Sequence, residues 1–346
     1  MKQSIQISYL VPEQKTAWDD FVLQTPSASL YHLFSWKKLM ERTFPHQTCY
    51  LCAEKEDQIV GVLPLVYVKS LIFGRFLVSM PFVNYGGIVA ENNDVRTKLL
   101  DAAIELAGKH RMALELRHAE SYELGLTRNQ CKVSMILDLP ESPDELWTSF
   151  RSKLRSQIKK PMKEGFEAHF GSKELLDDFY HVFAVNMRDL GSPVHGKKLF
   201  RNILDLFPNR AVICVVYARE VPVASGFLIG FRGRLEIPWA SSLRSYNRFA
   251  PNMLLYWKTL EYACEHGFRK FDFGRSTPNG GTYRFKAQWG AEPKQLYWDC
   301  WAKNQGMTEA GNRISPAMAR MVAVWKRLPV GLSKIMGPMV RKNIIA

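Results

Sequence analysis

The segment AVICVVYAREVPVASGFLIGF, residues 211–231, decides the fold of this chain. Its two parts, Ala211–Ala218 and Val221–Phe231, are rich in β-branched and other apolar residues, and the charged pair Arg219 and Glu220 separates them. Two apolar runs joined by a short charged turn are typical of a β-hairpin. We therefore expect two antiparallel strands here.

The same pattern occurs earlier in the chain. Thr48–Glu54 and Ile59–Val68 are apolar runs on either side of the charged turn Lys55–Asp57. The two hairpins lie about 160 residues apart, far beyond the roughly 20 to 50 residues of a solenoid repeat. An interval of that length indicates a duplicated domain.

Each hairpin is followed by the same succession of elements: a third extended stretch, a helix with apolar residues every three or four positions, a glycine near its end, and a strand. In the first copy these are Phe82–Ala90, Asp94–His110, Gly108 and Ala113–Arg117, and in the second they are Arg234–Ser242, Asn252–His266, Gly267 and Lys270–Gly274. We expect a mixed α+β fold of two tandem domains. Each should be a mostly antiparallel mixed sheet flanked by helices.

The domain boundaries follow from this order. We expect an N-terminal domain over residues 1–142, a connecting basic helix over 143–165, a C-terminal catalytic domain over 166–305 and an amphipathic helical tail over 306–346. Pro161 should kink or end the connecting helix, because proline lacks the amide donor. The tail either packs on the second domain or lies, as a basic amphipathic helix, on an anionic membrane surface.

The composition is that of a globular protein with a strongly basic surface. The 346 residues carry a net charge of +14, which attracts polyanions such as nucleic acid, anionic lipid or phosphorylated substrates. No run of about 18 apolar residues is present, and Met1–Leu10 lacks the pattern of a signal peptide. The six cysteines lie in apolar contexts, as in a reducing compartment. We expect a cytoplasmic protein, with peripheral contact at the inner face of the membrane as an extension of that expectation.

The densest chemistry lies in residues 270–290, KFDFGRSTPNGGTYRFKAQWG. A buried-looking strand runs into a glycine-rich loop, and three cations follow among aromatic side chains. Such a mixture just beyond a strand suits an anionic or strongly polarised ligand. We expect substrate to be bound by Arg275, Arg284, Tyr283 and Phe285.

Lys286 is the candidate catalytic residue of this segment. Acyl transfer requires stabilisation of the negative charge on the carbonyl oxygen under attack, and an ammonium can supply it. The alternatives are that Lys286 holds a donor phosphate or is an exposed helix charge. Asp272, on the preceding strand, is a candidate base or orienting partner of Arg275, with a structural salt bridge or loop cap as the alternative.

Further candidates lie outside this segment. Glu236 interrupts the apolar pattern of the third extended stretch, where a carboxylate can deprotonate an incoming amine, and Trp239 is a candidate wall of the substrate groove. Arg244 and Arg248 precede the second helix, in a connection without the glycine pair of an ordinary coenzyme A site. These two residues and Arg155, from the basic segment, are candidates to grip phosphates.

Neither a metal nor a tightly bound cofactor is expected. Cys49 and Cys52 form a CxxC pair on a predicted strand, where they point to opposite faces, and the eight histidines show no ligand spacing. The sequence contains no GxSxG motif.

Five segments together carry a resemblance to a known family: Leu33–Trp36, Lys153–Lys159, Met187–Val194, Phe271–Ser276 and Tyr283–Gly290. The chain resembles the FemAB-like branch of the GNAT superfamily, specifically the acetyltransferase-like FemAB proteins of exosortase/PEP-CTERM and exopolysaccharide loci. In Fem ligases, two GNAT-like domains transfer an amino acid from aminoacyl-tRNA to a lysine amine of a peptidoglycan precursor. The resemblance implies that Phe285 and Lys286 match the Phe-Lys pair in that family's reactive channel.

We therefore expect an N-acyltransferase that moves an acyl or aminoacyl group to an amine of a cell-envelope or exopolysaccharide precursor. The donor co-substrate is acyl-CoA or aminoacyl-tRNA, the acceptor is a small-molecule or lipid-linked sugar or peptide, and DNA is not an expected partner. Two alternatives stay open. One is an aminoacyl-tRNA-dependent peptidoglycan-type ligase, and the other is a non-catalytic protein that binds polysaccharide or lipid-linked precursor.

Overall fold

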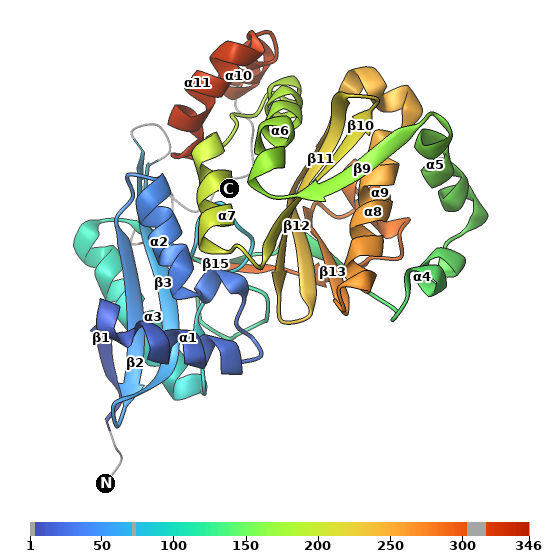
Figure 1. Ribbon diagram of the computed structural model, residues 1–346. Helices are drawn as coiled ribbons and strands as arrows, with labels where there is room; N and C mark the ends of the chain where they lie inside the picture. The colour runs from blue at the N-terminus through green and yellow to red at the C-terminus, as the bar shows by residue number, and fades with distance from the viewer. Residues whose placement is uncertain (1–3, 71–73, 303–315, 346) are drawn as a thin grey trace. The chain divides into compact units, whose positions relative to one another are not determined.

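The structure, a computed structural model, describes residues 4–70, 74–302 and 316–345 (Figure 1). The described residues form two compact units. The first unit draws its described residues from Met1–Cys131, Gln295–Arg313 and Lys342–Ala346, and the second draws its described residues from Lys132–Lys294 and Ile314–Arg341.

The first unit is built on a mixed sheet with the strand order β1-β2-β3-β4-β6-β15-β7. β4 and β6 are parallel, and the other neighbours along this path are antiparallel. The strands are β1 (Gln6–Tyr9), β2 (Thr48–Lys55), β3 (Gln58–Ser70), β4 (Gly74–Val78), β5 (Val89–Ala90, paired with β3), β6 (Ala113–His118), β7 (Thr127–Asn129) and β15 (Tyr297–Trp301). Its helices are η1 (Pro12–Gln14), α1 (Lys15–Gln24), η2 (Leu30–His32), α2 (Phe34–Thr43) and α3 (Asn93–His110).

Alternation along β2 gives the first unit a core on each face of its sheet. Leu51 packs in a cluster with Leu99 and Ala103 of α3, whereas the neighbouring Tyr50 contacts Trp18 of α1. Successive side chains of a strand point to opposite faces, so one strand serves both cores. α3 begins where it does because the side chain of Asn92 accepts a hydrogen bond from the Val95 amide at 3.0 Å.

The second unit repeats this plan, with the strand order β14-β8-β13-β12-β11-β10-β9. Here β12 and β13 are the parallel pair. The strands are β8 (Val133–Asp138), β9 (Phe166–Gly171), β10 (Ala211–Ala218), β11 (Val221–Phe231), β12 (Arg234–Ser242), β13 (Lys270–Ser276) and β14 (Glu292–Gln295). The helices are α4 (Pro143–Ser149), α5 (Ser152–Lys163), η3 (Lys173–Leu175), α6 (Leu176–Leu190), α7 (Lys197–Leu206), η4 (Arg244–Phe249), α8 (Pro251–Glu265), α9 (Gly281–Ala287), α10 (Pro316–Trp325) and α11 (Val330–Arg341).

Helices cover both faces of the second sheet (Figure 1). Leu228 of β11 packs in the cluster formed with α4, α5 and α8, and the ring of the adjacent Phe227 packs at an angle against Phe179 of α6 and Phe200 of α7. Each fully buried side chain of this size contributes roughly 1.5–3 kcal/mol. The expected fold class is confirmed, since each unit is an antiparallel-dominated mixed sheet flanked by helices.

Both predicted hairpins form, as β2–β3 and β10–β11, and the third stretch of the second copy is β12. The prediction of a strand over Phe82–Ala90 is wrong. The third strand of the first copy is β4, and within Phe82–Ala90 only Val89–Ala90 forms a strand. Met80, Phe82 and Gly86 adopt positive φ angles, which bend the backbone away from a strand. α3 also passes through Gly108 and ends at His110, where Arg111 takes the left-handed conformation.

The unit boundaries differ from the expected limits at residues 142 and 305. β8 was expected in the N-terminal domain, but it pairs with β13, and its Met135 and Leu137 are part of the second core. β15 was expected in the C-terminal domain, but it pairs with β6 and β7 of the first sheet. The first sheet thus takes β15 from beyond the second sheet's strands, whereas the strands of the second sheet, β8 to β14, are consecutive in the chain.

The expected connecting helix is in fact the pair α4 and α5, which belongs to the second unit. Leu146, Leu154 and Ile158 are buried in its core. Pro161 does not end α5, which runs two residues further to Lys163. The tail forms α10 and α11, and residues 306–315 and 346 of the expected tail lie outside the described residues. Among the described residues, no helix has the length and apolar character needed to cross a bilayer.

Candidate active site

The candidate site begins where β13 departs from regular pairing. The register between β13 and β8 shifts between Asp272 and Arg275, and Gly274 has a φ of +74°. That backbone conformation favours glycine, because a side chain there is strained. The carboxylate of Asp272 supports the bend, since its Oδ1 accepts a hydrogen bond from the Gly274 amide at 2.8 Å. The bend turns the carbonyls of Gly274 and Arg275 toward the helix that follows.

Lys286 lies on that helix, α9, and only 7% of it is exposed. Its Nζ donates hydrogen bonds to the carbonyl oxygens of Gly274 at 2.9 Å and Arg275 at 3.0 Å. The alternative that Lys286 is an exposed helix charge is therefore wrong. The two carbonyl groups at the bend in β13 hold its ammonium in place through these hydrogen bonds.

The electrostatics of the site act on this ammonium in opposing directions. Burial, and then the nearby Arg275, lower the pKa of Lys286 from 10.5 to about 8, whereas Asp272 and Glu236 raise it. Asp272 and Glu236 are register partners on the parallel strands β13 and β12, and both are buried. Two buried carboxylates thus oppose the loss of the lysine's proton.

Asp272 is also the centre of a buried network. The hydroxyl of Ser134 on β8 donates to its Oδ1 at 2.7 Å, and Arg234 lies 3.9 Å from its Oδ2. Together with the hydrogen bond from the Gly274 amide, these contacts make the Asp272 carboxylate a loop cap and an ion-pair partner. This is the structural alternative given for Asp272 in the sequence analysis.

A cavity of about 260 Å³ opens in front of Lys286. Phe285, Tyr256 and Leu255 form its apolar side, and Asn186 of α6 donates from Nδ2 to the Ser241 hydroxyl at 3.0 Å on its polar side. The remaining lining residues are Ala240, Ser242, Asn252, Gly281 and Thr282. An apolar pocket with a few convergent polar groups and one buried cation is the usual form of a small-molecule site.

The structure brings together Lys286, Phe285, Asp272, Glu236 and the backbone of Arg275, and it places the other predicted residues elsewhere. Trp239 packs against Phe200 and Phe227 and is not among the residues that line the cavity.

The other predicted binding residues lie on the helices α9 and η4. Tyr283 is half-buried against the core, and Arg284 is exposed on α9. Arg244 and Arg248 are exposed on η4, where the guanidinium of Arg248 lies over the Phe249 ring at 4.5 Å.

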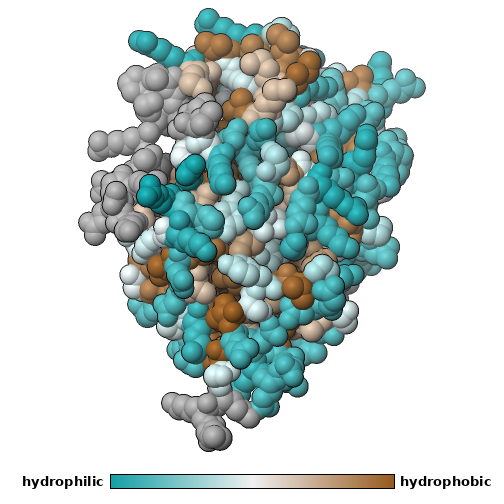
Figure 2. All heavy atoms as spheres, turned by 90° about the vertical axis from the view of Figure 1, so that its left-hand side faces the viewer, coloured by the Kyte–Doolittle hydropathy of each residue, from teal (hydrophilic) through white to brown (hydrophobic). Residues whose placement is uncertain are grey.

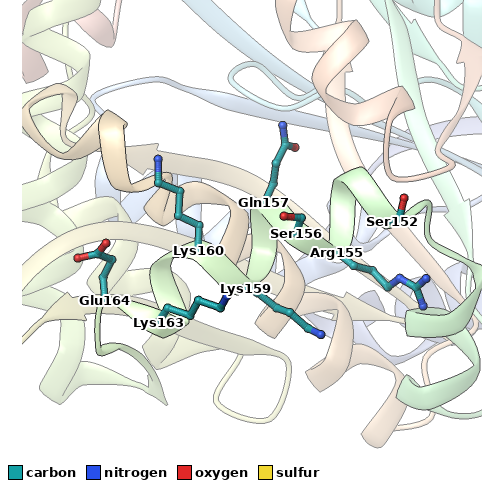
Figure 3. A pocket seen from close by; sticks show the side chains of 8 residues that line it. All are labelled: Ser152, Arg155, Ser156, Gln157, Lys159, Lys160, Lys163 and Glu164. Carbon is teal, nitrogen blue, oxygen red and sulfur yellow. The ribbon is translucent and has the colours of Figure 1, made fainter.

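Arg155 lines a second, open hollow of about 790 Å³ along α5. Figure 3 shows side chains of this helix around the hollow. Its lining consists of Ser152, Arg155, Ser156, Gln157, Lys159, Lys160, Lys163 and Glu164. α5 buries Leu154, Ile158 and Pro161 and turns its cations outward, so the hollow offers a cationic surface on a firmly packed helix.

Sequence reasoning missed the polar residues Asn186, Ser241 and Asn252. Asn186 directly precedes the motif Met187–Val194, and Ser241 is the last residue but one of the predicted strand Arg234–Ser242. Both residues thus lie in or next to segments that the sequence pattern singled out. A single polar residue near the end of a helix or strand, however, forms no pattern from which a binding role can be predicted. Among the described residues, no group of three or more His, Cys, Asp or Glu side chains is arranged to hold a metal ion.

The family model for the acetyltransferase (GNAT) domain matches residues 148–287, the part of the chain that contains α5, α8 and Lys286. The lipid II:glycine glycyltransferase of Staphylococcus saprophyticus is 21% identical, over 79% of this chain and 88% of that protein. The UDP-N-acetylmuramoylpentapeptide-lysine N(6)-alanyltransferase of Weissella viridescens is 22% identical, over 76% of this chain and 84% of that protein.

The fold is also found among solved structures. The crystal structure of FemX superimposes with a TM-score of 0.68 at 16% sequence identity, and the match covers 89% of this chain and 100% of that one. At this identity the match concerns the fold alone. Its extent shows that both units, and not only residues 148–287, have a counterpart.

Proposed function

We propose that this chain is a member of the FemAB-like branch of the GNAT superfamily and transfers an aminoacyl group to an amine of a cell-envelope precursor. It is an N-acyl- or aminoacyltransferase, and both curated relatives carry the name of an aminoacyl transfer to a peptidoglycan precursor. The observation that carries the proposal is the buried ammonium of Lys286 at the wall of an apolar cavity, beside Phe285.

In the proposed mechanism, the acceptor amine attacks the carbonyl carbon of the activated donor. Negative charge then develops on the carbonyl oxygen, and stabilising it is usually the largest catalytic contribution. A lysine ammonium has three protons, and the carbonyls of Gly274 and Arg275 accept two of them. The third proton of Lys286 is the proposed donor to the oxyanion.

The surroundings of Lys286 support this role. Phe285, Tyr256 and Leu255 give the cavity an apolar wall beside the Lys286 ammonium, and electrostatic interactions are stronger next to apolar groups than in bulk water. Asp272 and Glu236 favour the protonated form of the ammonium. We propose that both carboxylates act as counter-charges. When the tetrahedral intermediate collapses, the bond between the carbonyl carbon and the leaving oxygen of the aminoacyl ester breaks, and the proton of the attacking amine passes to that oxygen. The base function expected for Asp272 and Glu236 is therefore not required.

The hollow on α5 is the proposed contact for the donor. Arg155, Lys159 and Lys163 present cations at one-turn spacing, with Lys160 beside them, and cations that neutralise phosphates supply much of a protein's affinity for nucleic acid. Arg244 and Arg248 on η4 are a second exposed cationic pair, placed before α8 where a GNAT protein holds coenzyme A phosphates. Aminoacyl-tRNA is the proposed donor, and acyl-CoA is the competing one.

The decisive experiment offers the purified full chain each donor with each acceptor. Aminoacyl-tRNAs and acyl-CoAs are incubated with a lysine-containing muramyl peptide precursor and with an amino sugar, and products are identified by mass spectrometry. Consumption of aminoacyl-tRNA with modification of the peptide amine supports the proposal. Acylation by acyl-CoA alone would replace it with the simpler acyltransferase, and modification of neither acceptor would contradict it.

Neutralising Lys159 and Lys163 to glutamine is expected to raise the KM for aminoacyl-tRNA and leave kcat nearly unchanged. Each lost phosphate contact should reduce the slope of log affinity against log salt by about 1. The matched control replaces Lys98 and Lys109 by glutamine, since these lysines are exposed on α3 of the first unit. Equal salt dependence in the two double variants would show that the α5 hollow is not the donor contact.

Transfer activity is expected to fall as the pH rises through about 8, where Lys286 loses its proton. An ordinary lysine would remain charged until about 10.5. The pH profile of kcat/KM measures this, because it reports ionisations of the free enzyme. Activity that persists to the ordinary lysine pKa would contradict a role for the charged form.

A further inference from the structure

α11 turns its apolar side outward. Leu332, Ile335, Met336 and Met339 follow the spacing of one helix face, and they are 44–63% exposed. On the neighbouring α10, Met321 and Val324 are 57% and 63% exposed. Soluble helices normally bury such a stripe, so an exposed one marks a surface that meets a partner.

The inward side of α11 explains this orientation. Ser333 and Gly337 are buried, and a Cβ atom added to Gly337 would lie 2.8 Å from the Val194 side chain. Close packing of small residues fixes which side of the helix faces the protein. The apolar stripe is therefore held outward by the fold.

Further contacts attach this helical pair to α6 and the segment after it. Arg188 donates from Nη1 to the Leu328 carbonyl at 2.8 Å, and Arg341 donates from Nε to His195 Nε2 at 3.1 Å. Gly191, which ends α6, has room for no side chain because Val322 would lie 2.5 Å from its Cβ. The motif Met187–Val194 thus serves as the docking platform of α10 and α11.

The charge of the segment identifies the partner. Residues 316–346 contain no Asp or Glu, and they contain the cations Arg320, Lys326, Arg327, Lys334, Arg341 and Lys342. Arg320, Lys326 and Arg327 are exposed. Figure 2 shows hydrophobic side chains gathered at the top of the face it presents, where Figure 1 places α10 and α11. Apolar residues flanked by cations alone are the pattern of a helix that lies in the interface of an anionic bilayer.

We propose that α10 and α11 dock this protein on an anionic lipid surface through Met321, Val324, Leu332, Ile335, Met336 and Met339. A second copy of the chain is a poorer partner, because a symmetric contact would bring two sets of like charges together. α6 connects this surface to the candidate site, since Asn186 lines the Lys286 cavity less than two turns before Gly191. The docking proposal goes beyond the proposed function and does not depend on it.

The test is flotation of the full chain with phosphatidylcholine vesicles, with and without phosphatidylglycerol. The wild type is expected to float only with the anionic vesicles. The double variant Ile335→Ser and Met339→Ser should lose at least about tenfold in partitioning, since apolar burial supplies much of interfacial binding. Lys326→Gln and Arg327→Gln should cost about fivefold for each cation and flatten the salt dependence.

Two controls make the result specific to the helical pair. Val11→Ser and Leu23→Ser remove apolar residues of similar exposure, 45% and 42%, from the first unit, and should leave flotation unchanged. Lys159→Gln and Lys163→Gln test whether the α5 cations alone hold the protein on the vesicle. Thermal melts confirm that every variant is folded.

Three results would overturn the docking proposal. The first is flotation of the Ile335 and Met339 variant at the wild-type level, and the second is a loss of flotation caused only by the α5 variant. The third is a dimer in analytical ultracentrifugation that the Ile335 and Met339 variant dissociates, without binding of wild type to anionic vesicles. Transfer activity on a water-soluble acceptor is measured separately, so failure of docking and failure of the proposed function are distinguishable.

Discussion

Replacing Lys286 by methionine is expected to lower the rate of transfer by at least about 100-fold, because loss of one preorganised oxyanion donor typically costs that much. Methionine keeps most of the bulk beside Phe285 and removes the charge. The measurement is kcat/KM with the donor and acceptor identified by mass spectrometry. Undiminished turnover would eliminate the proposed role of Lys286.

The same variant is expected to remain folded. The folded-state pKa of Lys286, about 8, lies below the ordinary value of 10.5, so the unfolded chain binds more protons between these values and stability rises with pH across that window. Below about pH 8 the buried charge costs folding up to roughly 3 kcal/mol. Methionine removes this cost and also two hydrogen bonds, worth about 1 kcal/mol each.

The melting temperature of Lys286→Met at pH 7 should therefore stay within about 4 °C of the wild type. The matched control is Lys294→Met, in which an exposed lysine of β14 is replaced by the same residue. It should retain full activity. A Lys286 variant that is unfolded at pH 7 would show that the ammonium serves the structure first.

Replacing Asp272 by alanine is expected to lower the free energy of unfolding by roughly 3 kcal/mol, because one member of a buried charged network is removed. The Ser134 hydroxyl and the Gly274 amide would lose their acceptor, and the bend that supports Lys286 would lose its cap. Urea denaturation measures the change. The matched control Ser134→Ala removes one hydrogen bond and should cost about 1 kcal/mol.

The substitution Asp272→Asn removes the negative charge of the side chain and keeps its shape. The asparagine oxygen can still accept from the Gly274 amide, but the negative charge that raises the pKa of Lys286 is gone. The alkaline limb of the pH profile should therefore move to lower pH. A stable Asp272→Ala protein without activity would instead indicate that Asp272 acts as a base.

Much of the fold and one part of the site could be predicted locally. The hairpins β2–β3 and β10–β11, the helices α3 and α8 and the strand β12 follow from alternation and helical periodicity, which depend on neighbours in the chain. Lys286 and Phe285 stood out because cations and aromatic residues are concentrated in one short segment. The single polar residue Asn186 had no such local signal, since only the packing of α6 brings it to the cavity.

What the sequence by itself determined is therefore the repeated order of elements, the basic charge and the chemical character of residues 270–290. The tertiary structure alone decided that β8 and β15 join sheets other than those expected, that Trp239 is a core residue, and that Lys286 is buried over two carbonyls. The physical reason is that pairing of distant strands, burial and the pKa of a side chain depend on residues far apart in the chain, whereas periodicity and turn chemistry depend on adjacent ones.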